Sequence, residues 1–152
     1  MRSLSRSGAI TFVLLTASLI APLRVARPDV PHQAAPDMGA LWGAEWSAHH
    51  LDRVMTLYTS DAVFFTLDSR FKGLTSIRTL CRDALATYQP TIHMHRTAFG
   101  QSVDLAHESG EYDEILRSSG KERTTHGYYL MVLRKERGQW LIAEQMWTES
   151  KP

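Results

Sequence analysis

Hydrophobic and polar positions alternate least between residues 127 and 147, which read GYYLMVLRKERGQWLIAEQMW. Residues 128–133 are an unbroken run of aromatic, β-branched and long apolar side chains, typical of a strand covered on both faces. Residues 136–138 predict a tight turn, because they end in glycine between two such runs. Because both faces of the hairpin are apolar, another element must pack against each of them. We expect the upstream helices on one face and a second sheet or a partner subunit on the other.

The second strand of this hairpin carries both apolar and polar side chains on each of its faces. Strict alternation puts Trp140, Ile142 and Met146 on one face and Leu141, Ala143 and Trp147 on the other. Glu144 and Gln145 interrupt both faces, so this end is expected to meet water or the mouth of a pocket.

Helical spacing marks three segments upstream. Asp37 is expected to cap a helix over residues 38–49. After a break at His49-His50, a second helix is predicted over residues 51–58, with Tyr58 in its buried stripe. A third is predicted over residues 74–87, closed by Pro90.

The remaining segments are strand-like. A short strand is predicted over residues 62–67 and a polar loop over 68–73. Longer strands are predicted over residues 91–99 and 106–116. Three helices followed by a run of strands predict an α+β fold, with the helices packed on one face of a curved antiparallel sheet.

Residues 1–23 differ in composition from the rest of the chain. Residues 1–8 carry Arg2 and Arg6 and no acid, and residues 9–23 are almost continuously apolar. This is the pattern of an export signal, too short for the roughly 20 residues of a spanning helix. We expect a signal peptide or N-terminal anchor over residues 1–23 in an exported protein, periplasmic or secreted, with a membrane tether if the segment is kept. An apolar tail or a misassigned start are the alternatives.

Three prolines in residues 24–36 predict a linker, since proline cannot continue a helix. One domain over residues 37–150 follows. The whole chain of 152 residues has a net charge of +1, which gives no reason to expect a nucleic-acid partner. The single cysteine excludes an intramolecular disulfide.

The order of motifs along the chain resembles that of the nuclear transport factor 2-like superfamily. The resemblance rests on Trp46, the helix break, LDRVMTLYTSDAVF, Gly73, the GEY at residues 110–112 and the long hairpin. The closest branch is that of the SnoaL-like and related uncharacterised domains. The resemblance implies a cone-shaped α+β fold, with the curved sheet wrapped around the N-terminal helices. It also implies a small, mostly apolar ligand in the open end and a homodimer formed through the outer face of the sheet.

The chemistry of ketosteroid isomerase, which shares that fold, is not matched. That mechanism uses a carboxylate base and an oxyanion hole made by a tyrosine and a protonated aspartic acid. The resemblance places these roles on Thr66 (base), Trp42 (tyrosine) and Gly127 (acid). Threonine cannot act as a base near neutral pH, and glycine has no side chain.

A second pattern in the fold, as in scytalone dehydratase, uses histidines as general acid and base. His95 and His126 are the predicted catalytic pair, because imidazole titrates near neutral pH. Tyr112 and Asp68 are candidates to orient or share a proton. His93 shares a face with His95, but no third metal ligand is evident, and we expect neither a metal nor a cofactor. Packing or surface positions are the alternative for all three histidines.

The resemblance also suggests which residues face the ligand. The candidates are Trp42, Trp46, Phe64, Thr66, His93, Tyr129 and Trp147. The predicted function is binding of a small hydrophobic molecule, together with an unassigned lyase- or isomerase-like activity in the catalytic case. The alternative is a non-catalytic homo-oligomerisation module. The two alternatives predict different interiors of the cone. A catalytic cavity needs at least one buried titratable group aimed inward, whereas an assembly module can fill the cone with apolar side chains.

Overall fold

Six strands form a single curved sheet in the computed structural model, which describes residues 33–150. The strands are β1 (Tyr58–Phe65), β2 (Arg70–Lys72), β3 (Gln89–Gln101), β4 (Leu105–Ser118), β5 (Lys121–Glu136) and β6 (Gln139–Glu149). Their order across the sheet is β2-β1-β6-β5-β4-β3. All neighbours are antiparallel except β1 and β6, which run parallel. The predicted α+β class with a curved sheet is confirmed.

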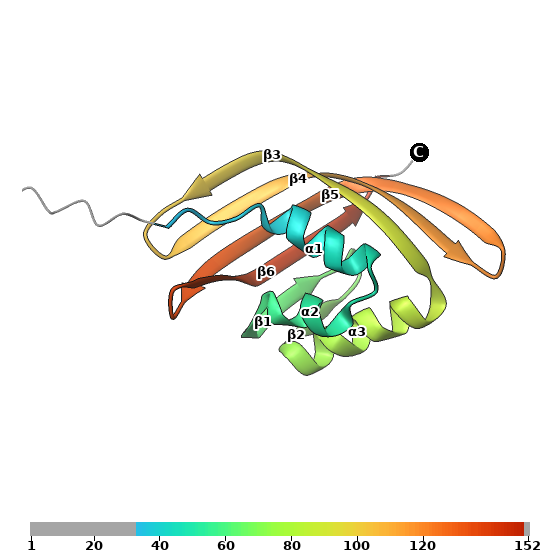
Figure 1. Cartoon of the computed structure of the whole chain (residues 1–152), viewed down its shortest axis with the longest axis horizontal. Helices are drawn as coiled ribbons and strands as arrows, with labels where there is room; N and C mark the ends of the chain where they lie inside the picture. Colours follow the sequence, from blue (N-terminus) through green and yellow to red (C-terminus); the bar gives the residue numbers. More distant parts are fainter. Residues whose placement is uncertain (1–32, 151–152) are drawn as a thin grey trace, which may run out of the picture. The chain divides into compact units, whose positions relative to one another are not determined.

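Three helices lie on the same side of this sheet (Figure 1). They are α1 (Met38–Ser47), α2 (Leu51–Thr56) and α3 (Leu74–Thr87). Asp37 caps α1 as predicted, its carboxylate accepting from the Ala40 N–H at 3.0 Å. A second acid, Glu108 on β4, accepts from the N–H groups of Met38 and Gly39 and so joins the start of α1 to the sheet.

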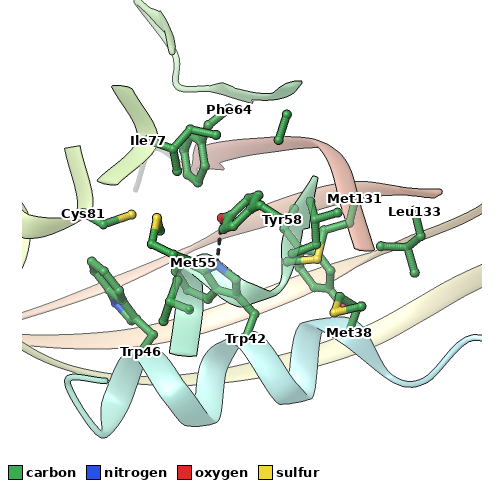
Figure 2. Packing of buried hydrophobic residues seen from close by; sticks show 14 of the residues in the cluster. Met38, Trp42, Trp46, Met55, Tyr58, Phe64, Ile77, Cys81, Met131 and Leu133 are labelled. Atoms are coloured by element: carbon green, nitrogen blue, oxygen red, sulfur yellow. Dashed lines mark hydrogen bonds between the residues drawn. The ribbon is translucent and has the colours of Figure 1, made fainter. Parts of the chain in front are cut away.

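The core lies between the helices and the inner face of the sheet (Figure 2). Trp42 and Trp46 from α1 are buried there with Met55 from α2 and Ile77 from α3. The inner positions of β5, at Tyr129, Met131 and Leu133, complete the contact. Their neighbours in sequence point to the opposite face, as alternation requires.

A β-bulge changes the faces predicted for β6. Leu133 pairs with Ile142 and Val132 pairs with Glu144, so Ala143 is the extra residue. Trp140 and Ile142 are buried before the bulge, but Gln145 is buried after it and Met146 is exposed. The prediction that Met146 shares the face of Trp140 while Trp147 lies on the opposite face is therefore wrong. Gln145 itself is fully buried.

Three local predictions are also corrected. The second helix ends at Thr56, and Tyr58 begins β1 instead of ending the helix. The predicted loop over residues 68–73 contains β2. The strand predicted from residue 91 begins at Gln89, so Pro90 lies within β3, where it is tolerated because β3 is an edge strand. The predicted turn between β5 and β6 is present, with positive φ at Arg137 and Gly138.

The last residues of the predicted linker contact the domain. The Ala35 N–H donates to the Gln101 side chain at 2.7 Å, and the Trp140 indole donates to the Gln33 carbonyl at 3.1 Å. The predicted export segment, residues 1–23, lies outside the described residues, as does most of the linker, and both stay predictions. None of the helices within residues 33–150 is long and apolar enough to cross a membrane.

These contacts predict where the chain can be shortened. A chain beginning at Asp37 should lose about 1 kcal/mol of unfolding free energy relative to one beginning at Gln33, because it loses these hydrogen bonds. Urea unfolding of the two chains measures the difference. Equal midpoints would mean that residues 33–36 contribute nothing to the stability of the domain.

Candidate functional site

A cavity of about 460 Å³ opens between α1, α3 and the inner face of the sheet. Aromatic side chains make up much of its wall: Trp42 and Trp46 from α1, Phe64 from β1, Tyr88 after α3, Tyr112 from β4 and Trp147 from β6. Leu80, Cys81 and Ala84 contribute the α3 side. The polar lining groups are Thr66, Asp68, Glu114 and Glu149. The cavity is thus an apolar space with a few polar groups, which is usual for small-molecule sites.

The aromatic rings stand at fixed angles to one another. Trp42 and Trp46 stack with centroids 5.1 Å apart and an interplanar angle of 24°. Trp147 meets Trp42 edge-on at 4.9 Å and 76°. Tyr112 in turn meets Trp147 at 4.8 Å and 84°. Each contact lies within the range where aromatic pairs attract, so the walls are held by one another.

A buried hydrogen-bond chain supports these walls from behind. The Trp42 indole donates to the Tyr58 hydroxyl at 2.8 Å (Figure 2), and that hydroxyl donates to the Gln145 side-chain oxygen. Burial raises the pKa of Tyr58, so it stays a neutral donor. The bulge in β6 is what brings Gln145 to this face. The orientation of Trp42 is therefore set by its own helix, α1, together with the strands β1 and β6.

Glu114 is one of the titratable groups in the cavity wall. It lies on β4, half-buried, and its carboxylate accepts a hydrogen bond from the Trp46 indole at 3.0 Å. Burial raises the pKa of Glu114 above its ordinary value, and the Trp46 hydrogen bond opposes that rise. Burial and the Glu114 and Glu149 carboxylates also raise the pKa of Tyr112 to about 12. Glu114 can hold or accept a proton, whereas Tyr112 stays protonated.

The raised pKa of Glu114 predicts a pH dependence of stability. Below the unfolded-state pKa the group is neutral in both states and costs nothing. As the pH rises toward and through the folded-state pKa, ionisation favours unfolding and stability falls. Glu114→Gln should therefore raise the melting temperature at neutral pH, with the gain vanishing in acid. Glu144→Gln, at an exposed position on β6, is the control. A constant difference across the pH range would contradict the assignment.

Cys81 also lines the cavity but offers no nucleophile. Burial raises the pKa of its thiol to about 12, so the thiolate is not formed near neutral pH. In residues 33–150, no group of three or more His, Cys, Asp or Glu side chains is placed to hold a metal ion.

Five of the seven predicted ligand-facing residues line this cavity: Trp42, Trp46, Phe64, Thr66 and Trp147. Their contact with a ligand stays a prediction. Tyr129 is buried instead against the start of α1, beside Gly39 and Glu108. His93 is exposed on β3 and borders a separate depression next to α1. At Gly127, a Cβ atom would lie 2.7 Å from the Tyr112 hydroxyl, so that position has no room for an acid.

The predicted catalytic histidines do not face the cavity. His95 and His126 are exposed on the outer face of the sheet, on β3 and β5. Asp113 lies between them, 2.9 Å from the His126 Nδ1 and 3.8 Å from the His95 Nε2. Alternation explains the outcome, because the inward positions of these strands go to Ile92, Met94 and Tyr129. The expectation that the histidines face the ligand is wrong.

Sequence reasoning missed Glu114, although a signal was present. Tyr112, Glu114 and Leu116 share one face of β4 by alternation, and all three line the cavity. Tyr112 had been singled out as a candidate, so its i+2 neighbour was a natural companion. The α3 lining residues, such as Ala84, are part of the ordinary apolar stripe of that helix and carried no functional signal.

Comparisons with known proteins agree with this architecture. A sequence profile of the SnoaL-like domain family matches residues 37–145. A ketosteroid isomerase-like protein from Erwinia carotovora atroseptica has a similar structure, with a TM-score of 0.71 at 17% identity over 76% of this chain and 92% of that one. Among curated proteins, none matches the sequence.

Two further solved structures have the same fold. One is a putative aromatic ring hydroxylase from Novosphingobium aromaticivorans, with a TM-score of 0.70 at 18% identity over 76% of this chain and 86% of that one. The other is a putative calcium/calmodulin dependent protein kinase II association domain from Xanthomonas campestris. Its TM-score is 0.64 at 23% identity, over 72% of this chain and 80% of that one. At these identities the likeness shows the fold alone.

Proposed function

Since the chain belongs to the SnoaL-like domain family, we propose that it binds a small hydrophobic molecule in the cavity between α1, α3 and the sheet. The observation that carries this proposal is the hollow aromatic cone with a half-buried carboxyl group, Glu114, in its wall. A domain that served assembly alone would gain stability by filling this space with side chains, because empty apolar volume forgoes packing energy. An unfilled cavity therefore favours ligand binding over a purely structural role.

Glu114 is also the group that would carry a proton in an isomerase- or lyase-like reaction. Its pKa is raised by burial, which moves a carboxyl group toward the pH range where acid–base catalysts operate. It accepts a hydrogen bond from an indole that is itself stacked on Trp42, so its position is fixed. In such a reaction Glu114 takes the role that sequence analysis gave to histidines.

The four tryptophans permit a direct test of binding. Trp42, Trp46 and Trp147 line the cavity, whereas Trp140 lies elsewhere and donates to Gln33. Titration with naphthalenemethanol, a neutral bicyclic alcohol, should shift the NMR signals of the three cavity indoles. The Trp140 signal is the internal control and should stay in place. Unchanged cavity signals, or equal shifts of all four, would refute the proposal.

A second proposal concerns the outer face of the sheet, where we infer a homodimer. Tyr128, Leu130 and Met146 are exposed there by 53%, 38% and 43%. Leu130 and Met146 are paired across β5 and β6, in the middle of the sheet. Adjacent exposed apolar side chains of this size are typical of interaction surfaces. A second copy of the chain supplies the cover that the hairpin pattern requires.

Sedimentation at micromolar concentration tests this inference. The protein should be a dimer that buries at least roughly 1,000 Å², and Leu130→Glu should make it a monomer because a charge would be buried at the interface. Val103→Glu, at an exposed apolar position in the β3–β4 turn, is the matched control and should stay dimeric. A monomeric wild-type protein would contradict the proposed homodimer.

A further inference from the structure

Every charged side chain that lines the cavity is acidic. Asp68 comes from the loop after β1, Glu114 from β4 and Glu149 from the end of β6. Within the part of the chain that the structure describes, no lysine, arginine or histidine lines this space. The guanidinium group of Arg123 on β5 is close, but it lies 3.0 Å from a Glu149 carboxylate oxygen and is occupied by that ion pair. Glu114 has no such cationic partner in the wall.

The aromatic side chains that line the cavity with Glu114 lie in several planes. The Trp42 and Trp46 planes are nearly parallel, and Trp147 stands almost perpendicular to Trp42. Tyr112 stands almost perpendicular to Trp147. The faces of such rings carry partial negative charge, and tryptophan attracts cations most strongly. A cation in this cavity would therefore have tryptophan side chains as well as carboxylates in the surrounding wall.

We propose that the ligand of this cavity is a hydrophobic amine, whose ammonium group lies among the tryptophan rings and next to the Glu114 carboxylate. This inference rests on the proposed binding function and adds the charge of the ligand to it. An anionic ligand would meet three carboxyl groups and no free cation. A neutral ligand would gain the apolar contacts but no charge attraction to the acidic wall.

The protonation of Glu114 follows from the same geometry. In the empty cavity, burial disfavours its charged form, and an ammonium group next to it restores that form. The charged and titratable groups that face it are Glu149 on β6, Arg123 on β5 and Tyr112 on its own strand. Binding of an amine should therefore weaken when the pH is lowered enough to protonate Glu114.

Three probes with one ring system test the inference: naphthylmethylammonium, naphthalenemethanol and naphthoate. Calorimetric titration of the full chain near neutral pH should show the ammonium binding about tenfold more tightly than the alcohol, and the carboxylate more weakly than either. In Glu114→Gln the preference for the ammonium should become smaller, because only the tryptophan rings and the other two carboxylates remain. In the wild type, acidification should weaken the ammonium but not the alcohol, which gives a second measurement that needs no variant.

Each outcome separates this inference from the proposed function. If the alcohol and the ammonium bind equally, or the carboxylate binds best, the charge assignment is overturned while hydrophobic binding stands. If the preference for the ammonium is undiminished in Glu114→Gln and on acidification, the cation is held elsewhere and the site assignment is overturned. If none of the three binds or shifts the cavity indoles, both the inference and the proposed function fail.

Discussion

Glu108→Ala is expected to lower the free energy of unfolding by about 3 kcal/mol, since removing one partner of a buried charged hydrogen bond leaves the others unsatisfied. Glu108 is fully buried on β4. Its carboxylate accepts from the Met38 N–H at 3.1 Å and from the Gly39 N–H, and Arg96 lies 3.5 Å away. The first amides of a helix have no partner within the helix, so this acid from a distant strand completes α1.

The expected loss of unfolding free energy in Glu108→Ala is the result of two opposing effects. Burial raises the pKa of Glu108, so its ionised form carries a desolvation penalty that the variant removes. Against this, alanine leaves two amides without their acceptor, removes one of the two carboxylates near the Arg96 guanidinium group and leaves a void. Breaking such a buried set is usually strongly unfavourable.

Urea unfolding of Glu108→Ala measures the loss, and two further variants serve as references. Glu108→Gln should lose roughly half as much, because one amide oxygen can accept while the amide nitrogen faces another donor. Glu111→Ala, at an exposed position on the same strand, should change stability by less than about 0.5 kcal/mol. If Glu108→Ala matched Glu111→Ala, the buried carboxylate would not be what holds α1 to the sheet.

Glu108 also illustrates what the sequence could not reveal. Its immediate neighbours, His107 and Ser109, are polar, so the local pattern gave no sign of burial. Its partners are backbone N–H groups about 70 positions away in the chain, and such groups leave no trace in a pattern of side chains. Burial of an acid at this position depends on where α1 meets the sheet.

The helices and the hairpin were predictable because each has a strong local signal. The apolar stripe of α3 and the turn at Arg137-Gly138 both follow from nearest neighbours in the sequence. The bulge at Ala143 does not. One inserted residue exchanges the faces of everything after it, which is why Gln145 is buried and Met146 is exposed. The turn fixes the register only at the start of β6.

The large apolar residues of the candidate site could be predicted from the sequence, but its titratable residue could not. Trp42, Trp46 and Trp147 are large side chains in a family pattern with a hollow cone, and they line the cavity. His95 and His126 were favoured for their chemistry alone. Their placement on the outer face follows from strand parity, which fixes Ile92 and Tyr129 inward. Alternation along β4 from Tyr112 would have placed Glu114, together with Glu108, on the inner face.

Filling the cavity is expected to abolish ligand binding while the domain stays folded. Ala84 on α3 lines the cavity and is half-buried. In Ala84→Phe the ring would enter existing space and bury apolar surface there, so stability should change by less than about 1 kcal/mol. The affinity for naphthalenemethanol should fall by more than about tenfold, because the ring and the probe would need the same volume.

Ala86→Phe is the matched control, since it adds the same ring to the same helix at an exposed position. It should bind the probe as the wild type does, and its cavity indoles should shift on titration while those of Ala84→Phe should not. Equal binding by both variants would place the probe outside the cavity. Loss of binding in Ala84→Phe, with a native melting temperature and a normal Ala86→Phe, would assign binding to the cavity bounded by α1, α3 and the sheet.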